Sequence, residues 1–340
     1  MSTDIGIDLG TKKTILLSGS KIISEQPSVV TVNTETWEPI CFGEKAYSMI
    51  GRTPESLTTV FPIRRGVISD YNIAEKMLKH FMKESFGNRI LKPRVMVSMP
   101  IGVTSVQHRS VANAVESAGG RNVCTIESPV AAAIGLGVDF KKPRGSFIID
   151  IGAGTTDTAT ISMGGLANCD SARVASGDFD EAIVRYIRKK YNVFVGLQTA
   201  EKIKKQIGSV VKRQVELTMR VKGRNLLTGL PVFVDVSSND VYCAVADTAH
   251  SICTAVKSVI ENTPPELVAD IMNNGALLTG GGALIYGMPQ LLSETLGLEV
   301  VPDEDPVHSV ARGAGIALRN PDLLKNSDYQ FRSIQELVIN

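Results

Sequence analysis

The sequence has few cysteines and almost no net charge. Its five cysteines (Cys41, Cys124, Cys169, Cys243 and Cys253) are scattered, without Cys-x-x-Cys spacing. This usage disfavours a disulfide framework or a zinc site and indicates reduced thiols in the cytosol. The formal net charge is only +1, so nothing favours wholesale nucleic-acid binding, and little net repulsion opposes self-association.

Long apolar runs and low-complexity segments are also missing. No run approaches the roughly 20 apolar residues that a transmembrane helix needs. An apolar strand pattern begins almost at the N-terminus, so we expect no signal peptide. The 340 residues are 43% hydrophobic, which is enough for a sizeable core in two or more domains. Strand and helix patterns alternate in both halves, which predicts an α/β fold.

The most informative stretch is Ser146–Thr160, SFIIDIGAGTTDTAT. A short apolar run predicts a buried strand that ends at Asp150, followed by a Gly-rich turn and a return strand. Backbone N–H groups of such a turn can bind anionic oxygens, and glycine permits positive φ and close approach of a phosphate. An aspartate at the strand tip suits a hydrated Mg2+ ion.

A second copy of this layout occupies Ile5–Thr14, IGIDLGTKKT, with Asp8, Gly10 and Thr11 in the same order. The two aspartates are about 140 positions apart, roughly one domain length. The repeat suggests two related half-molecules whose hairpins face each other and hold the phosphates and metal of a nucleotide. Two unrelated hairpins are the alternative, and the shared order of Asp, Gly and Thr argues against it.

The remaining patterns place further elements. Apolar spacing predicts helices over Asp70–Phe86 with Asp70 as a cap, Thr104–Ala118, Asp178–Tyr191 with capping-box spacing of Asp178 and Glu181, and Thr199–Val210. Alternation between Lys212 and Ser237 predicts a β-ribbon around 222–224 and 228–229. Ala276–Leu284, ALLTGGGAL, predicts a strand, three glycines and a helix N-terminus beside a nucleoside. Small residues in Ile126–Gly137 and Pro306–Leu318 predict helices that pack closely.

Three glycine-bearing loops in this order resemble the actin, Hsp70 and sugar-kinase superfamily. Within it the chain resembles the bacterial actin MreB family over nearly its whole length. The stretches that carry the resemblance are IGIDLGT, PSVV, GVISDY, KPRV, MPIGVT, EAIVRYIRKKYN, TAEKIK, TGLP, TPPELVADI, LTGGGAL and ARGAGIAL.

The resemblance implies an actin-like ATPase fold: two duplicated RNase H-like α/β halves, each with a small inserted subdomain, around a nucleotide cleft. The implied subdomains are 1–29 with 66–142 and 312–333 (IA), 30–65 (IB), 143–178 with 243–311 (IIA), and 179–242 (IIB). It also implies ATP or ADP with Mg2+, and head-to-tail, paired filaments of the protein with itself. The resemblance further implies other MreB paralogues as partners and filaments at the inner, cytoplasmic face of the cell membrane. We expect no nucleic-acid partner, because the net charge is near zero.

The same resemblance assigns site residues. Asp8 and Asp150 would hold the metal through water. The phosphates would lie on Gly10, Thr11, Lys12, Gly152, Gly154, Thr155 and Thr156, and the nucleoside on Gly177, Glu201, Lys204, Gly280, Gly281 and Gly282. The plainer alternatives are aspartates that cap turns, threonines that favour strands, a solvated surface lysine at position 12, and a surface ion pair of Glu201 with Lys204.

Catalysis is expected at Asp150, Thr155 and the position of Ser128. The family usually has Glu-Glu-Pro where this chain has Glu127-Ser128-Pro129, and the second Glu is expected to orient the attacking water. A serine hydroxyl is shorter and has no charge to act as a base near neutral pH. The resemblance therefore implies an ATPase whose hydrolysis is slow.

Membrane attachment is expected at Ile90 and Leu91, a pair flanked by Arg89, Lys92 and Arg94. In the family a two-residue apolar loop here dips into the membrane, and neighbouring cations suit anionic lipid. The alternative is two ordinary core residues at a helix end.

Two other function classes share the same core. An Hsp70-like chaperone would need a peptide-binding domain after the core, which we do not expect here. A sugar-kinase-like enzyme would need an acceptor pocket with a catalytic base, and the sequence offers no acidic candidate in such a context.

Overall fold

The computed structural model describes residues 4–87, 92–139, 142–320 and 332–333. One sheet contains β1 (Asp4–Leu9), β2 (Lys13–Ser18), β3 (Lys21–Pro27), β9 (Arg94–Met99), β10 (Arg121–Glu127) and β19 (Arg332–Ser333). A second contains β11 (Ser146–Ile151), β12 (Thr156–Ser162), β13 (Gly165–Ala172), β17 (Ala276–Thr279) and β18 (Val300–Pro302).

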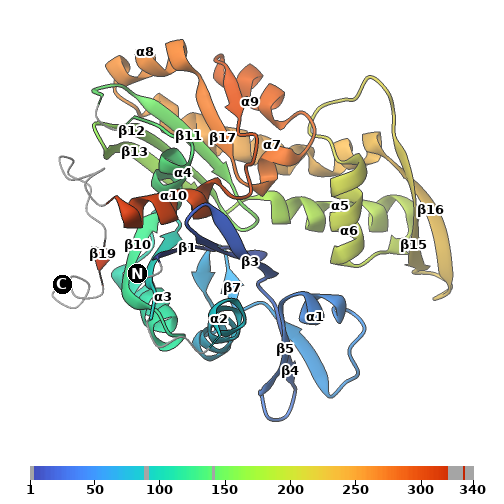
Figure 1. Cartoon of the computed structure of the whole chain (residues 1–340). Coiled ribbons are helices and arrows are strands. Elements are labelled where there is room, and N and C mark those ends of the chain that lie inside the picture. Colours follow the sequence, from blue (N-terminus) through green and yellow to red (C-terminus); the bar gives the residue numbers. More distant parts are fainter. Residues whose placement is uncertain (1–3, 88–91, 140–141, 321–331, 334–340) are drawn as a thin grey trace.

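The two sheets share one pairing order (Figure 1). In the first, β3, β2 and β1 are antiparallel neighbours, and β1 continues into the parallel pair β9 and β10. In the second, β13, β12 and β11 are antiparallel neighbours, and β11 continues into the parallel pair β17 and β18. This repetition confirms the expected pair of related α/β halves.

Each half carries a smaller lobe. The first contains β4 (Val30–Asn33), β5 (Pro39–Phe42), α1 (Gly43–Ser48) and β6 (Leu57–Val60), and the hairpin of β7 (Ile63–Arg64) and β8 (Val67–Ile68) follows it. The second contains α5 (Ser176–Tyr191), β14 (Val193–Phe194), α6 (Leu197–Ile207), β15 (Thr218–Asn225) and β16 (Pro231–Ser237). Figure 1 shows β15 and β16 extending away from the main sheets.

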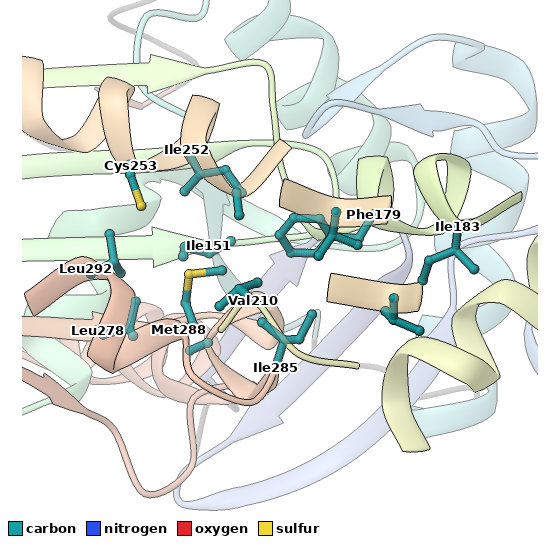
Figure 2. Packing of buried hydrophobic residues seen from close by; sticks show 14 of the residues in the cluster. Ile151, Phe179, Ile183, Val210, Ile252, Cys253, Leu278, Ile285, Met288 and Leu292 are labelled. Atoms are coloured by element: carbon teal, nitrogen blue, oxygen red, sulfur yellow. The ribbon is translucent and has the colours of Figure 1, made fainter. Parts of the chain in front are cut away.

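The remaining helices cover the sheets because each has one apolar face. They are α2 (Tyr71–Phe86), α3 (Ser105–Ser117), α7 (Ser238–Glu261), α8 (Pro265–Asn274) and α9 (Met288–Leu296). In Figure 2, Ile151, Phe179, Ile252 and Met288 pack together from a strand and three helices, and all four side chains are buried. This core of the second half supports the start of α5 beside the turn that follows β11.

Helices α4 (Ser128–Gly135) and α10 (Ser309–Arg319) pack between the two sheets. Their contact is close because glycines lie at the crossing. A Cβ atom on Gly313 would lie 1.6 Å from the carbonyl oxygen of Ala131, and one on Gly135 would lie 2.1 Å from that of Ser309. The close packing predicted from small residues is confirmed.

Most predicted elements are present, with three local corrections. Asp70 does cap α2, since its carboxylate accepts from the N–H of Ile73 at 3.0 Å. Asp178, however, is not the cap of α5: it lies in the first turn and accepts from the N–H of Ala175. Position 223 lies inside β15 rather than in a turn. The three glycines lead into a short 3₁₀ helix, η1 (Gly281–Leu284), rather than an α-helix.

No helix in the described ranges combines the length and apolar character that crossing a bilayer would require.

Candidate nucleotide-binding site

The two predicted hairpin turns have the same closing hydrogen bond. The N–H of Gly10 donates to the carbonyl of Lys13 at 3.0 Å, and that of Gly152 donates to the carbonyl of Thr155 at 2.9 Å. The turns also touch each other, because a Cβ atom on Gly154 would lie 2.2 Å from Oγ1 of Thr11. The structure thus brings the two halves of the expected phosphate site together.

These glycines are needed because other atoms pack closely against them, and not because their backbone has positive φ. Gly10, Gly152 and Gly154 are absent from the glycines with positive φ, which corrects the expectation for the turns. A Cβ atom at Gly10 would instead lie 2.7 Å from the carbonyl oxygen of Lys13. A side chain there would open the turn and block the backbone N–H groups from an anion.

Three carboxylates lie on the strands that enter and leave these turns: Asp8 on β1, Asp150 on β11 and Asp157 on β12. Burial, and then the charges of Asp157 and Asp8, raise the pKa of Asp150 well above its usual range. Burial also raises the pKa of Asp8 to about 6, against a hydrogen bond of 2.7 Å from the hydroxyl of Ser98. Buried like charges disfavour ionisation, and a bound cation would relieve them.

This arrangement suits a hydrated divalent cation. In the ranges that the structure describes, no three Asp, Glu, His or Cys side chains gather closely enough to hold a metal by themselves. Mg2+ in nucleotide sites commonly binds through one or two carboxylates, substrate phosphates and water. The pair Asp8 and Asp150 fits that pattern.

Asp157 is a further site residue, to which the sequence analysis assigned no role. It lies directly opposite Asp150 on β12. Its carboxylate accepts from the hydroxyl of Thr155 at 2.7 Å and from the N–H of Ile101 at 3.0 Å. Burial raises its pKa despite these hydrogen bonds and one from Ser171. Its sequence signal was a second aspartate in the same hairpin motif.

Lys12 does not lie free in solvent. Its ammonium pairs with Asp180 of α5 and, at 3.3 Å, with Glu201 of α6. Lys204 also reaches Asp180, at 2.8 Å, and donates to the carbonyl of Ser176. These contacts join the first hairpin to the second small lobe. The alternatives of a solvated Lys12 and a surface ion pair of Glu201 with Lys204 are therefore wrong.

Glu201 is strongly held in its ionised form. Burial alone would raise its pKa, but the charges of Lys12 and Lys205 and hydrogen bonds from Lys205 and Tyr47 lower it to about 2. Asp180, which pairs with Lys12 and Lys204, was not identified in the sequence analysis. It falls on the buried stripe of α5 with Ile183 and Ile187, where a charged residue signals a partner.

The glycines expected near the nucleoside pack against the second hairpin. A Cβ atom on Gly280 would lie 2.4 Å from Oδ1 of Asp150, and one on Gly177 would lie 2.5 Å from the carbonyl oxygen of Ala153. A Cβ atom on Gly282 would lie 2.3 Å from Cγ2 of Ile151, whereas a Cβ atom on Gly281 would have nothing within 4 Å. Gly281 therefore leaves open space beside the predicted nucleoside loop.

Ser128 begins α4 at the end of β10 and is buried. Its hydroxyl donates to the carbonyl of Met99 at 3.1 Å. The hydroxyl hydrogen is therefore engaged by backbone, and the side chain carries no charge.

The family model described as MreB/Mbl protein matches residues 2–326. The chain belongs to the MreB/Mbl family. The bacterial actin resemblance is confirmed.

Relatives of this MreB/Mbl chain align along nearly its full length. The cell shape-determining protein Mbl of Bacillus cereus is 41% identical over 323 residues, which cover 94% of this chain and 97% of Mbl. The cell shape-determining protein MreB of Escherichia coli K12 is 40% identical over 329 residues, covering 95% of each.

Solved structures show the same fold. MreB5 of Spiroplasma citri bound to AMPPNP is 35% identical, with a TM-score of 0.90 over 95% of this chain and 97% of that one. A MamK double helical filament, at 21% identity and a TM-score of 0.80, supports the fold alone. The actin-like α/β fold of this MreB/Mbl chain is thus confirmed.

Two predicted residues have no structural account in this family member. Ile90 and Leu91 lie outside the described residues. Their membrane role stays a prediction from the sequence.

Proposed function

We propose that this MreB/Mbl family member binds Mg-ATP between its two hairpin turns and assembles head-to-tail into paired cytoskeletal filaments for cell shape or a related mechanical role. The observation that carries the proposal is the contact of two equivalent turns, Gly10–Lys13 and Gly152–Thr155, next to the half-buried carboxylate of Asp8 and the buried carboxylate of Asp150. Homologous MreB5 bound to AMPPNP and to ADP supports nucleotide binding.

The residues present divide the work of binding. Backbone N–H groups of the turns, with Thr11, Thr155 and Thr156, would hold the phosphates, and Lys12 would neutralise them once released from Asp180. Asp8 and Asp150 would hold Mg2+ through water, and the metal would neutralise phosphate charge. Gly177, Glu201, Lys204 and Gly280–Gly282 would border the nucleoside. The cleft would lie among the four subdomains expected from sequence.

Hydrolysis is slow in this proposal because Ser128 stands where a carboxylate would orient water. Losing such a group typically costs about 10²–10⁴-fold in rate. Ser128→Glu should raise phosphate release at least about 10-fold at equal ATP occupancy. Ser128→Ala is the matched control and should leave the rate nearly unchanged. No rise in the Glu variant, with ATP still bound, would remove Ser128 as the explanation.

Assembly is tested by light scattering and electron microscopy of the full chain with and without Mg-ATP. Concentration-dependent filaments support the proposal. A phosphorylated product in a sugar screen, without polymer, would favour the kinase class instead, and nucleotide-dependent peptide binding would favour the Hsp70 class.

Membrane attachment belongs to the same proposal. We place the filament at the inner face of the cell membrane, held by Ile90 and Leu91 with the nearby cations Arg89, Lys92 and Arg94. Two apolar residues are a weak anchor, so many copies must act together. Replacing both with serine should abolish co-sedimentation with anionic liposomes while polymerisation persists; unchanged co-sedimentation would place the anchor elsewhere.

A further inference from the structure

The hairpin of β7 and β8 turns through Arg65 and Gly66, and both have positive φ, 49° and 71°. A two-residue loop of this kind normally has Asn-Gly or Asp-Gly, because both central residues must be left-handed. A bulky side chain at positive φ is an outlier that persists only when its surroundings hold it. Arginine is therefore an unusual residue for this turn, as is Met163 in the β12–β13 turn, and its surroundings decide whether it has a role.

The surroundings of the turn are the two phosphate hairpins. The N–H of Gly66 donates to Oγ1 of Thr11 at 2.9 Å. A Cβ atom on Gly154 would lie 2.8 Å from Cα of Arg65, and one on Gly66 would lie 2.2 Å from Cγ of Pro100. The Arg65–Gly66 turn thus lies against both hairpins, with Arg65 beside Gly154 and Gly66 beside Thr11. Gly66 also packs on Pro100, the residue after Met99.

The guanidinium of Arg65 is free to bind an anion beside the two hairpins. Its side chain is exposed, and within the part of the chain that the structure describes its guanidinium has no hydrogen bond or ion pair. Both lysines of the first hairpin are already paired, Lys12 with Asp180 and Glu201 and Lys13 with Glu25. A planar guanidinium binds two phosphate oxygens at once, which an ammonium cannot do in the same geometry.

We propose that Arg65 is a phosphate-binding residue that contacts the terminal phosphate of the bound nucleoside triphosphate. This inference rests on the proposed nucleotide site and adds a residue to it. The turn places the arginine beside Gly154 and Thr11, so that its guanidinium neutralises the phosphate farthest from the nucleoside. A nucleoside diphosphate lacks that phosphate and gains nothing from Arg65.

The test compares Mg-ATP and Mg-ADP affinities of the full chain with fluorescent nucleotides. Arg65→Gly removes the guanidinium and suits the left-handed backbone, so the variant should fold at least as stably as the wild type. We expect ATP to bind about 10–100-fold more weakly and ADP to bind unchanged. Arg65→Lys should recover part of the loss, and Arg64→Ala, the matched control in β7, should change neither affinity.

The outcomes separate this inference from the proposed function. Equal losses for ATP and ADP would mean a structural role, and unchanged ATP affinity in Arg65→Gly would mean no role; either result overturns the inference while leaving the nucleotide site intact. A wild-type chain that binds neither nucleotide would overturn both.

Discussion

The hydroxyl of Tyr47 donates a hydrogen bond of 2.9 Å to Oε2 of Glu201, joining α1 of one small lobe to α6 of the other. The side chain of Gln198 adds a second bond, 2.6 Å to the carbonyl of Tyr47. Glu201 also holds Lys12 of the first hairpin. One carboxylate thus connects both small lobes and the predicted phosphate site.

Tyr47→Phe should lower the free energy of unfolding by about 1.5 kcal/mol, because a hydrogen bond to a charged, mostly buried acceptor is lost. Urea unfolding of the nucleotide-free protein measures this. Tyr71→Phe is the control, since Tyr71 is 37% exposed and its hydroxyl has no partner in the described ranges. A loss in the control as large as in Tyr47→Phe would contradict the assignment.

The same carboxylate predicts a pH dependence. The pKa of Glu201 is lowered from 4.5 to about 2, so its contribution to stability is present above about pH 4.5 and is lost as the pH falls toward 2. Glu201→Gln should therefore be less stable than wild type by on the order of 2 kcal/mol near neutral pH. Unfolding curves at several pH values should converge in acid, and a pH-independent gap would count against this role.

Asp150 opposes folding in the absence of a cation, because burial and the charges of Asp157 and Asp8 raise its pKa. Asp150→Asn should stabilise the nucleotide-free protein by about 1–3 kcal/mol. It should also abolish the rise in melting temperature that Mg-ATP produces in the wild type.

The control for Asp150 is Asp247→Asn, an exposed aspartate of α7, which should change neither quantity appreciably. Differential scanning calorimetry with and without Mg-ATP decides the matter. A nucleotide-free Asp150→Asn protein that melts below the wild type would show that the carboxylate is stabilising.

Gly313→Ala should be strongly destabilising because the added Cβ would meet the carbonyl of Ala131 at 1.6 Å. Overpacking typically costs about 1–3 kcal/mol, and here the neighbour is backbone that cannot rotate away. Gly196→Ala is the control, since nothing lies within 4 Å of its Cβ position. Chemical unfolding compares the two, and equal stabilities would mean that α4 and α10 can separate at little cost.

Local patterns in the sequence determined the elements and the two hairpins. Apolar spacing placed α2, and Asp70 before it was recognisable as a cap because an N-cap interaction spans only three residues. The repeated Asp-Gly-Thr order indicated two related halves, and family motifs indicated the nucleotide site. These features are local or repeated, so they can be read without knowing which segments meet.

Only the tertiary structure decided which distant charges meet. Lys12 and Asp180 are 168 positions apart and Tyr47 and Glu201 are 154 apart, and no periodicity links such residues. The tertiary structure likewise brought Asp8 of the first half near Asp150 of the second and placed Arg65 against Gly154. The pKa values of buried charges depend on desolvation and on partners that distant segments supply. The charge state and ion pairs of this site therefore follow from the tertiary structure and not from the sequence pattern.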